Sequence, residues 1–536
     1  MQTADYIVVG AGSAGCVIAS RLSEDHAVSV ILIEAGNSGP RALVSTPAGM
    51  RYLMTHKRAS WGFVAEADPS INGARRPWPR GKVLGGSSAI NGLIYLRGDR
   101  RDYDAWAEAG CTGWSFNELL PYFMRSEGFE GDPPGQSHGT FGPMSVSRQR
   151  SPHRLAGNFL EGCAEIGIDH NEDYCGGEQE GAFIPLTNQR RGKRSSSAEA
   201  FLSRAKGRRN LTIITDCEVD KVLVAGGRAT GVKLQRRDGT AFELGASREV
   251  ILSAGSIGSP AILMRSGIGP AAHLKGHGIA VLLDAPQVGQ NLQEHAVISE
   301  QRAVNVATWN TQARQPRLLW EMLRYGLFRR GLLTSPAVCA MAAVRTLPEL
   351  EMPDITLHLM PMAMFPPKQP GGFPVIPAAP GIRLVASINQ PRSRGEIRLS
   401  GPDVKDRPLI DHRMVSDPWD MACMVRGLQL VQRLLATEAF ARVVTGSLEP
   451  SARPGASVAE LEAFVREWTG IGLHPVGTCR MGVDAAAVVD PQLRLNGIAG
   501  LRVADASIMP WLISGNTNAA SMMIGEKAAD FIRGMG

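Results

Sequence analysis

Two segments near the C-terminus carry side chains that could move a proton. "LHPVGTCRMG" (473–482) contains His474, and "SGNTNAASMMIGEKAADFI" (514–532) opens with Asn516 before an apolar, helix-like run. An imidazole can accept a proton near neutral pH, and an amide can donate a hydrogen bond to a developing negative charge. A histidine packed in the core is the alternative for His474. The N-terminal part of the chain decides between the two.

"DYIVVGAGSAGCVIASRLSEDHAVSVILIEAG" (5–36) predicts a strand, a helix and a second strand. The apolar runs at 6–9 and 28–33 are typical of buried parallel strands, with a helix over 16–22 between them. Glycines at Gly-x-Gly-x-x-Gly spacing permit a tight turn, a backbone approach to a pyrophosphate and close helix packing. The helix N-terminus attracts phosphate. A glycine-rich turn of an ordinary α/β protein is the alternative.

An acidic residue follows the second strand. Glu34 can accept two hydrogen bonds from a ribose diol, and its charge disfavours a 2′-phosphate. The unit therefore predicts a dinucleotide site, although it does not distinguish FAD from NAD. The residues expected to hold the dinucleotide in this segment are Gly10, Gly12, Ser13, Ala14, Gly15, Glu34 and Ala35.

Two further segments are rich in glycine. "WPRGKVLGGSSAINGLIYLRG" (78–98) can present backbone donors and the Asn91 amide, and a solvated surface loop is its alternative. "ILSAGSIGSPAILMRSGIGP" (251–270) predicts a strand and then a helix starting near Pro260, because proline suits a first helical turn. Between them, residues 210–237 alternate like strands joined by a Gly-Gly turn.

The character of the sequence changes between 300 and 460. Residues 354–365 and 381–390 are typical of strands, and 421–440 predicts a strongly amphipathic helix. Residues 365–381 are apolar and rich in Pro and Gly. They fit either a loop without function or a mobile lid over a pocket.

The bulk composition excludes several classes of protein. The chain has 536 residues, is 44% hydrophobic and carries a net charge of +6 that is spread along the sequence, so nucleic-acid binding is not expected. We expect no integral membrane segment and no signal peptide. The 8 cysteines show no CxxC spacing. This disfavours a disulfide framework or a metal site and favours a cytoplasmic location.

Five segments together resemble the glucose–methanol–choline (GMC) oxidoreductases. They are the N-terminal strand–helix–strand unit, "GKVLGGSSAINGLIYLRG", "GSIGSPAILMRSGIG", "HPVGTCRMG" and "LRVADASIMPWLISGNTNAASMMIGEKAADFI". The similarity is collinear over essentially the whole chain and is greatest to bacterial alcohol, choline and sorbose dehydrogenases.

The resemblance implies a fold that combines α/β and α+β parts. A Rossmann-like FAD-binding domain would comprise residues 1–100, 190–300 and 465–536. A discontinuous substrate domain, an antiparallel sheet flanked by helices, would comprise 101–189 and 301–464.

The resemblance also implies that the dinucleotide is FAD and that His474 and Asn516 are catalytic. The family oxidises alcohols by moving a hydride to flavin N5 while a base takes the hydroxyl proton. The helix starting near Thr517 would direct its N-terminus at the flavin and favour the anionic reduced form. Further family-like cofactor contacts are Trp61, Val83, Gly86, Asn91, Gly92, Leu93, Val219, Asp505, Ala506, Thr517 and Asn518.

Departures from the family pattern limit the expected chemistry. Ile90 stands where some members attach FAD through a histidine, so the cofactor should be non-covalent. "TSPAVCAMAAV" (334–344) has no acid where choline-specific members carry one, and Cys339 or its neighbour takes that place. A buried cation needs a counter-charge or an aromatic cage. His358 resembles a substrate-site histidine, with a core histidine as its alternative. A neutral primary alcohol is therefore the expected substrate.

Three function classes remain open at this stage. An FAD-dependent alcohol dehydrogenase is favoured over an O₂-using alcohol oxidase on the resemblance alone, with a quinone, a dye-like acceptor or O₂ as the electron acceptor. A lyase acting on cyanohydrins would keep FAD for structure. A flavin-stabilised binding protein would show no turnover.

Overall fold

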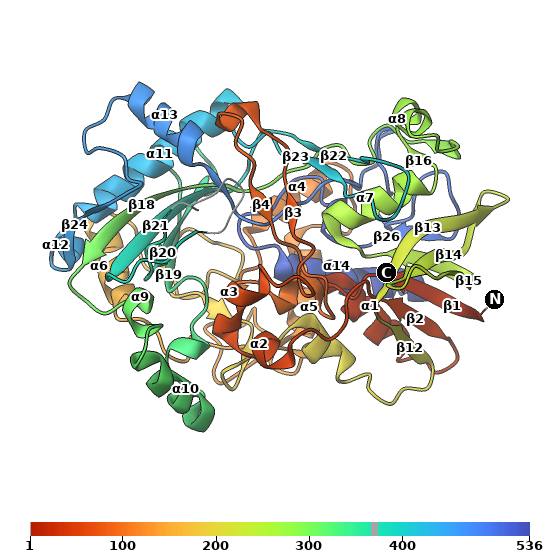
Figure 1. Ribbon diagram of the computed structural model, residues 1–536, viewed down its shortest axis with the longest axis horizontal. Helices are drawn as coiled ribbons and strands as arrows, with labels where there is room; N and C mark the ends of the chain where they lie inside the picture. Colours follow the sequence, from red (N-terminus) through yellow and green to blue (C-terminus); the bar gives the residue numbers. More distant parts are fainter. Residues whose placement is uncertain (1, 366–373, 536) are drawn as a thin grey trace.

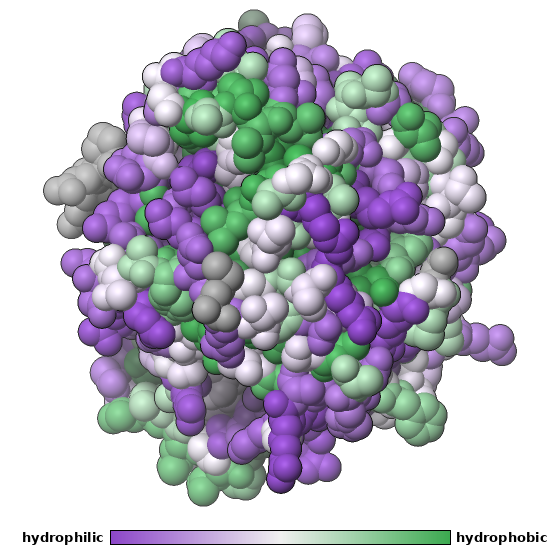
Figure 2. Space-filling model, turned by 90° about the vertical axis from the view of Figure 1, so that its right-hand side faces the viewer, coloured by the Kyte–Doolittle hydropathy of each residue, from purple (hydrophilic) through white to green (hydrophobic). Residues whose placement is uncertain are grey.

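The structure is a computed structural model that describes residues 2–365 and 374–535. Two β-sheets lie at opposite ends of the molecule, and helices fill the space between them (Figure 1). The seven-stranded sheet is at the right of the view and the six-stranded sheet at the left. The face at the free end of the seven-stranded sheet is mostly hydrophilic, with hydrophobic residues gathered toward its top (Figure 2).

The seven-stranded sheet contains the predicted N-terminal unit. Its strand order is β12-β2-β1-β15-β14-β13, with β26 beside β15. The strands are β1 (Gln2–Val9), β2 (Val30–Ile33), β12 (Leu211–Ile214), β13 (Cys217–Ala225), β14 (Arg228–Arg236), β15 (Ala241–Leu252) and β26 (Leu501–Val503). The strands β12, β2, β1, β15 and β26 pair in parallel, whereas β13 and β14 are antiparallel. The predicted Gly-Gly turn joins β13 to β14 through Gly226 and Gly227, both at positive φ.

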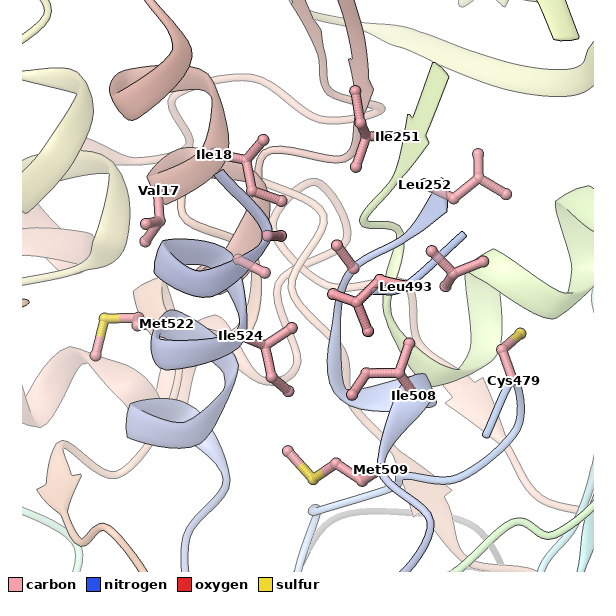
Figure 3. Packing of buried hydrophobic residues seen from close by; sticks show 14 of the residues in the cluster. Val17, Ile18, Ile251, Leu252, Cys479, Leu493, Ile508, Met509, Met522 and Ile524 are labelled. Carbon is pink, nitrogen blue, oxygen red and sulfur yellow. The ribbon is translucent and has the colours of Figure 1, made fainter. Parts of the chain in front are cut away.

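Helices α1 (Ser13–Leu22) and α14 (Asn518–Arg533) pack closely against each other beside this sheet. Figure 3 shows Val17 and Ile18 of α1 near Met522 and Ile524 of α14. A Cβ on Gly525 would lie 2.8 Å from the carbonyl oxygen of Ala14, so only glycine permits this approach. The close packing brings the N-termini of the two helices together, and the Ser13 hydroxyl donates to Asn518 Oδ1 at 2.8 Å.

The six-stranded sheet has the order β19-β20-β21-β18-β24, with β25 beside β18. Its strands are β18 (Ala296–Val304), β19 (Ala340–Val344), β20 (Ile355–Met360), β21 (Gly381–Ile388), β24 (Val444–Leu448) and β25 (Gly470–Ile471). Helix α11 (Pro418–Leu435) packs on β18, β20 and β21. The predicted helix over 421–440 is thus two helices, because α11 ends at Leu435 and α12 (Glu438–Ala441) follows it.

The helix predicted to start near Pro260 begins five residues earlier. Helix α7 runs over Gly255–Arg265, with Pro260 in its interior. Proline has no N–H, so it leaves the carbonyl of the residue four positions earlier without its helical partner. The Thr478 hydroxyl donates to that carbonyl of Ser256 at 2.7 Å. A distant loop therefore makes the proline tolerable inside the helix.

The other helices are short or lie at the surface. They are α2 (Arg41–Ser45), α3 (Met50–Leu53), α4 (Arg100–Glu108), α5 (Phe116–Ser126), α6 (Leu155–Glu165), α8 (Ala271–Gly276), α9 (Trp309–Gln312), α10 (Arg317–Phe328) and α13 (Val458–Trp468). Among the residues that the structure describes, no helix is both long and apolar enough to span a membrane. Residues 366–373 of the predicted lid segment (365–381) lie outside the described residues.

The two sheets draw on different parts of the chain. All strands of the seven-stranded sheet fall within the ranges expected for the FAD-binding domain. In the six-stranded sheet, β25 comes from the range expected for the FAD-binding domain and pairs with β18 through Gly470 and Val297. The segment that leads to His474 thus links the two sheets.

Gly525→Ala should lower the thermal unfolding midpoint of the purified protein. The added methyl group overlaps the Ala14 carbonyl, and overpacking of this kind costs about 1–3 kcal/mol. Gly157→Ala in α6 is the matched control, because nothing lies within 4 Å of its Cβ. Helix propensity should make that change stabilising by up to about 1 kcal/mol. Equal midpoints for the two variants would contradict the close packing of α1 and α14.

Candidate active site

A cavity of about 540 Å³ lies between the two sheets. It runs from the glycine-rich end of β1 to the open face of the six-stranded sheet. The predicted residues that line it are Gly10, Gly12, Ser13, Ala14, Glu34, Ala35, Trp61, Gly86, Asn91, Gly92, Leu93, Val219, His358, His474, Asp505, Ala506, Asn516, Thr517 and Asn518. Residues far apart in the sequence are therefore brought to one site.

Two glycine-rich loops meet at one end of the cavity. Gly10 has φ of +97°, which a residue with a side chain rarely adopts. A Cβ on Gly86 would lie 2.7 Å from the Cα of Gly12, so the second loop crosses directly over the first. The N-terminus of α1 opens between the loops, and its free N–H groups suit a pyrophosphate.

Glu34 is held at the end of β2 with both oxygens engaged. Oε2 accepts from the Ala11 N–H at 3.0 Å and Oε1 accepts from the Gly36 N–H at 2.9 Å. Burial raises the pKa of Glu34 to about 7. Each oxygen keeps a second lone pair for a ribose hydroxyl. The glycine loops, the helix N-terminus and this carboxyl group together fit the ADP half of a dinucleotide.

Three predicted site residues do not line the cavity. A Cβ on Gly15 would lie 1.9 Å from the Gly10 carbonyl oxygen, so Gly15 serves the packing of α1 on β1. Val83 is buried and its carbonyl accepts from the Gly86 N–H at 2.6 Å. The Cys339 side chain is buried in the core of the six-stranded sheet, and its neighbour Val338 lines the cavity instead. A thiol packed among apolar side chains cannot contact a substrate.

His474 and Asn516 are in direct contact. The Asn516 amide nitrogen lies 2.8 Å from His474 Nε2, and His474 Nδ1 lies 2.9 Å from His295 Nδ1. His295 Nε2 in turn lies 3.1 Å from the Asn389 carbonyl oxygen and 3.2 Å from that of Ile513. His295 is buried and His474 is partly buried, and burial is the main cause that lowers the pKa of His474 well below 6.5 and that of His295 to about 4.

These contacts define one tautomer for each histidine. Carbonyl oxygens only accept, so His295 Nε2 carries the hydrogen and the neutral ring keeps a lone pair on Nδ1. His474 Nδ1 must then donate to that lone pair. The lone pair of His474 therefore lies on Nε2, where it accepts from the Asn516 amide. The geometry leaves a basic nitrogen at the cavity wall.

Glu294 fixes the backbone of both histidines. Its carboxyl group accepts from the His474 N–H at 2.7 Å and from the His295 N–H at 2.9 Å. Burial raises the pKa of Glu294 to about 7, and Arg80 lies close enough to lower it. The buried Glu294 carboxyl group therefore holds the backbone at both histidines in place.

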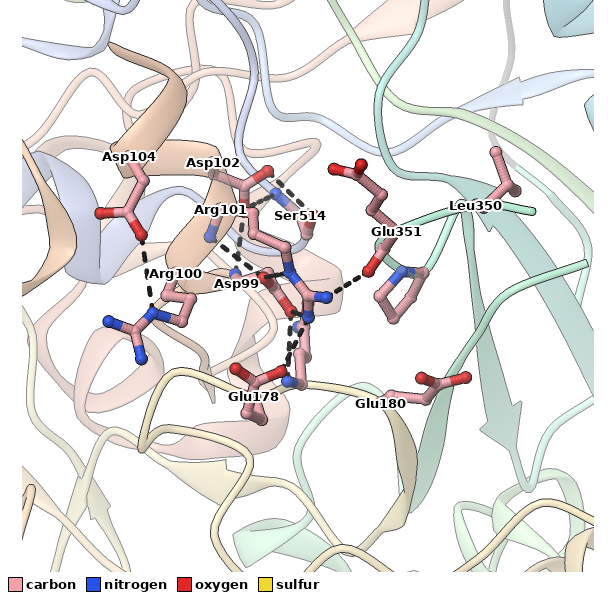
Figure 4. A network of polar contacts seen from close by, with 12 residues as sticks. Asp99, Arg100, Arg101, Asp102, Asp104, Glu178, Glu180, Leu350, Glu351 and Ser514 are labelled. Carbon is pink, nitrogen blue, oxygen red and sulfur yellow. Dashed lines mark hydrogen bonds and ion pairs between the residues drawn. The ribbon is translucent and has the colours of Figure 1, made fainter. Parts of the chain in front are cut away.

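A polar network supports the carbonyl that orients His295. Asp102, near the start of α4, accepts from the Ser514 N–H at 2.7 Å and from its hydroxyl at 3.0 Å, next to Ile513 (Figure 4). Asp102 also accepts from the Asp99 N–H at 2.9 Å, which completes the cap of α4. Burial raises the pKa of Asp102 to about 7. The helix cap and the active-site loop therefore share one carboxyl group.

The middle of the cavity carries polar groups suited to a flavin. Arg194 donates to Asn91 Oδ1 at 2.8 Å and so orients the Asn91 amide. Thr517 and Asn518 begin α14 at the cavity wall, and Asn516 Oδ1 is buried without a hydrogen-bond partner among the described residues. A buried acceptor without a partner indicates that a bound molecule completes the site. These residues fit the isoalloxazine end of FAD.

The six-stranded sheet forms the remaining wall. His358, Met360, Val385 and Ser387 line it, and burial is the main cause that lowers the pKa of His358 to about 3. No group of three or more His, Cys, Asp or Glu side chains arranged for a metal ion occurs within residues 2–365 and 374–535. Arg383 also lines this wall and carries a positive charge.

Sequence reasoning missed two residues of this site. His295 lies in "NLQEHAV" directly before β18, where the acid–histidine pair of Glu294 and His295 was a usable signal. Arg383 lies in an otherwise apolar strand and lines the cavity. Only the pairing of β21 with β18 and β20 reveals which face of the strand it occupies.

Comparisons with known proteins identify the family of the chain. Family models described as GMC oxidoreductase match residues 4–297 and 391–525. The chain is 39% identical to an oxygen-dependent choline dehydrogenase of Sinorhizobium medicae, covering 99% of this chain and 96% of the relative. It is also 39% identical to an alcohol dehydrogenase [acceptor] of Pseudomonas putida, covering 98% and 95%.

Solved structures share the whole fold. Pyridoxine 4-oxidase from Mesorbium loti superposes with a TM-score of 0.88 at 33% identity, covering 98% of each chain. A formate oxidase superposes with a TM-score of 0.91 at 26% identity, covering 99% of this chain and 98% of that one. The chain belongs to the GMC oxidoreductase family and is an FAD-dependent oxidoreductase that acts on CH–OH donors.

Proposed function

We propose that the protein oxidises a primary alcohol to the aldehyde, with His474 as the general base and Asn516 as the hydrogen-bond donor to the substrate oxygen. The observation that carries this proposal is the lone pair of His474 Nε2, which faces the cavity beside the Asn516 amide at 2.8 Å. Bound FAD supplies the acceptor for the hydride that leaves the carbinol carbon.

The chain's own residues handle the proton. An N–H of Asn516 occupies the one lone pair of His474 Nε2, so this hydrogen bond must be released before Nε2 can accept the hydroxyl proton of the alcohol. The released amide N–H would then donate to the alcohol oxygen as that oxygen becomes negative. His474 Nδ1 keeps its hydrogen and its contact with His295 throughout. The nearby Glu294 carboxyl group lies behind the ring that gains the positive charge.

The cofactor is held without a covalent bond in this proposal. The ADP half would contact Glu34 and the two glycine loops, and the flavin end would contact Asn91, Thr517 and Asn518. Ile90 lines the cavity where a histidine would be needed for attachment, and its side chain has no nucleophilic atom. Denaturation should therefore release FAD into the supernatant.

Quaternary ammonium substrates fit this cavity poorly. Strands β20 and β21 contribute His358, Met360, Arg383, Val385 and Ser387, and none of these is acidic. A buried trimethylammonium group would lack a counter-charge on this wall. We favour a dehydrogenase that passes its electrons to a quinone, a dye-like acceptor or O₂. This proposal follows the analogy with the alcohol dehydrogenase [acceptor] relative.

His474→Ala should slow anaerobic flavin reduction by an alcohol by about 100- to 10,000-fold, because the general base is lost. Asn516→Ala should slow it by about 100- to 1,000-fold. Stopped-flow absorbance of the FAD-loaded variants measures both rates, and the FAD content should stay at the wild-type level. His26→Ala, at an exposed histidine, is the control. Wild-type rates in His474→Ala would exclude the base assignment.

The pH profile of kcat/KM should rise to a plateau with an apparent pKa below 6.5. Burial lowers the pKa of His474, so its neutral, basic form persists to lower pH than that of a free imidazole. Activity is then lost only as the pH falls below that range. His474→Ala should remove this dependence. A wild-type rise that occurs well above pH 6.5 would show that another group is titrating.

A further inference from the structure

A cationic side chain lies in the cavity wall without an ion pair to an acid among the described residues. Arg383 is on β21, and its Nε donates to the Ser299 hydroxyl of β18 at 2.8 Å. Alternate residues of a strand share one face, so Arg383, Val385 and Ser387 all face the cavity, and all three line it. The guanidinium therefore belongs to the wall that a substrate would touch.

Within the described part of the chain, no carboxylate lies within 4.0 Å of Arg383 to form an ion pair. Burial alone lowers the pKa of Arg383 to about 10, so the group stays charged at neutral pH. Residues 366–373, "PPKQPGGF", contain no Asp or Glu. Arg383 is partly buried. A cation withdrawn from water without an acidic partner is costly, which indicates that a bound molecule supplies the counter-charge.

Strand pairing gives the position of Arg383 along the cavity. Ser387 pairs with Val297, which also pairs with Gly470 in the segment that leads to His474. Four residues along β21, Arg383 pairs with Met360 of β20. At about 3.3 Å per residue, Arg383 lies about 13 Å along the strand from Ser387, which is the position nearer to His474. Between them lie Val385 and its pairing partner on β20, His358, while Met360 lies beside Arg383 itself.

We propose that the preferred substrate is an alcohol with an oxyanion, a carboxylate or a phosphate, at the end of the molecule remote from the hydroxyl group. The hydroxyl end would meet His474 and Asn516, the middle would contact Val385 and His358, and the oxyanion would pair with Arg383 beside Met360. This inference rests on the proposed alcohol oxidation. It replaces the expectation of a neutral alcohol, because the sequence alone did not put a cation in the cavity.

The test compares substrates of equal chain length with the FAD-loaded enzyme. The series contains n-alkanols, ω-hydroxycarboxylates, ω-hydroxyalkyl phosphates and ω-aminoalcohols, together with choline. We expect kcat/KM for at least one of the two anionic series to exceed that for the alkanols by tenfold or more. The comparison of carboxylates with phosphates identifies the oxyanion. Choline and the aminoalcohols should be the poorest substrates, because Arg383 repels a cation.

Variants of Arg383 show whether the preference comes from this residue. Arg383→Met should reduce the ratio of anionic to neutral kcat/KM at least tenfold while alkanol oxidation continues, and Arg383→Lys should restore part of the ratio. Arg237→Met, at an exposed arginine, is the matched control. A wild-type preference for alkanols or cations, or an equal loss for all substrates in Arg383→Met, would overturn the proposal. Absence of oxidation of every alcohol would instead overturn the proposed function.

A separate surface feature lies on α10. This helix inverts the usual arrangement, because its buried residues are Glu321 and Tyr325 while its apolar side chains face outward. The exposed apolar side chains are between 52% and 66% accessible and comprise Leu319, Trp320, Met322, Leu323, Leu327 and Phe328. Figure 1 shows α10 projecting from the lower left of the molecule. Contiguous apolar exposure of this kind marks an interaction surface.

The charges beside this apolar face are almost all positive. Residues 314–330 contain five arginines, at 314, 317, 324, 329 and 330, and a single acid, Glu321. Glu321 is buried, and its carboxylate accepts from the Leu332 N–H at 2.8 Å. The solvent side of the segment is therefore apolar and cationic. A twofold contact between two copies would bring these arginines together and is disfavoured.

We propose that the α10 face binds the surface of an anionic lipid bilayer, with its Leu, Trp, Met and Phe side chains in the headgroup boundary and the arginines on acidic headgroups. The 3₁₀-helix η5 (Leu332–Thr334) packs against α10, and the cavity-lining Ala337 and Val338 follow within a few residues. The bilayer contact would thus lie near one wall of the cavity.

Vesicle flotation of the FAD-loaded protein tests this surface. The wild type should bind vesicles of phosphatidylcholine and phosphatidylglycerol at least tenfold better than vesicles of phosphatidylcholine alone, and salt should weaken the binding. Leu319→Gln/Leu323→Gln/Leu327→Gln should lose at least tenfold in binding while it keeps its FAD. Phe141→Gln/Val458→Gln is the control, since both residues are exposed elsewhere. Equal binding by the triple variant, no wild-type binding, or a dimer that the triple variant abolishes would overturn the proposal.

Discussion

Two backbone carbonyl oxygens determine which nitrogen of His474 can act as a base. The carbonyls of Asn389 and Ile513 both accept from His295 Nε2, and this contact sets the tautomers of His295 and then of His474. Asn389 directly follows β21, and its side-chain amide donates to the Pro353 carbonyl at 2.9 Å. Ile513 precedes α14. His474 therefore holds its lone pair on Nε2 only when the segments around Asn389 and Ile513 are folded against His295.

The cofactor end depends on a different constraint, the absence of side chains. Gly10, Gly12 and Gly86 let two loops and a helix N-terminus converge where phosphates need backbone donors. Gly525 lets α14 approach α1, so the second helix begins beside the same cavity. The dinucleotide site and the proton-transfer pair thus meet in one cavity because α14 carries Asn516 to Asn518 at its start.

Much of the fold and of the cofactor end could be predicted from the sequence, because glycine spacing and apolar runs are local signals. The strands around Gly10 and the Gly226–Gly227 turn are confirmed. The predicted start of α7 was wrong. Thr478, far along the chain, donates a hydrogen bond to the carbonyl that Pro260 leaves without a helical partner, so the proline can lie inside the helix. The roles of His295 and Arg383 could not be derived from the sequence, since they depend on strand register and on carbonyls from distant loops. Cys339 was predicted to contact the substrate, but it lies in the core and its neighbour Val338 lines the cavity. A shift of one residue in extended chain exchanges the core side for the cavity side.

The tautomer of His474 is the central claim, and nitrogen NMR of the FAD-loaded enzyme with ¹⁵N-labelled histidine measures it most directly. His474→Gln and His295→Gln assign the two rings among the 11 histidines. At neutral pH, His474 should show a protonated Nδ1 and an unprotonated Nε2, and His295 the reverse. A protonated Nε2 on His474 would contradict the account, because no lone pair would then face the substrate.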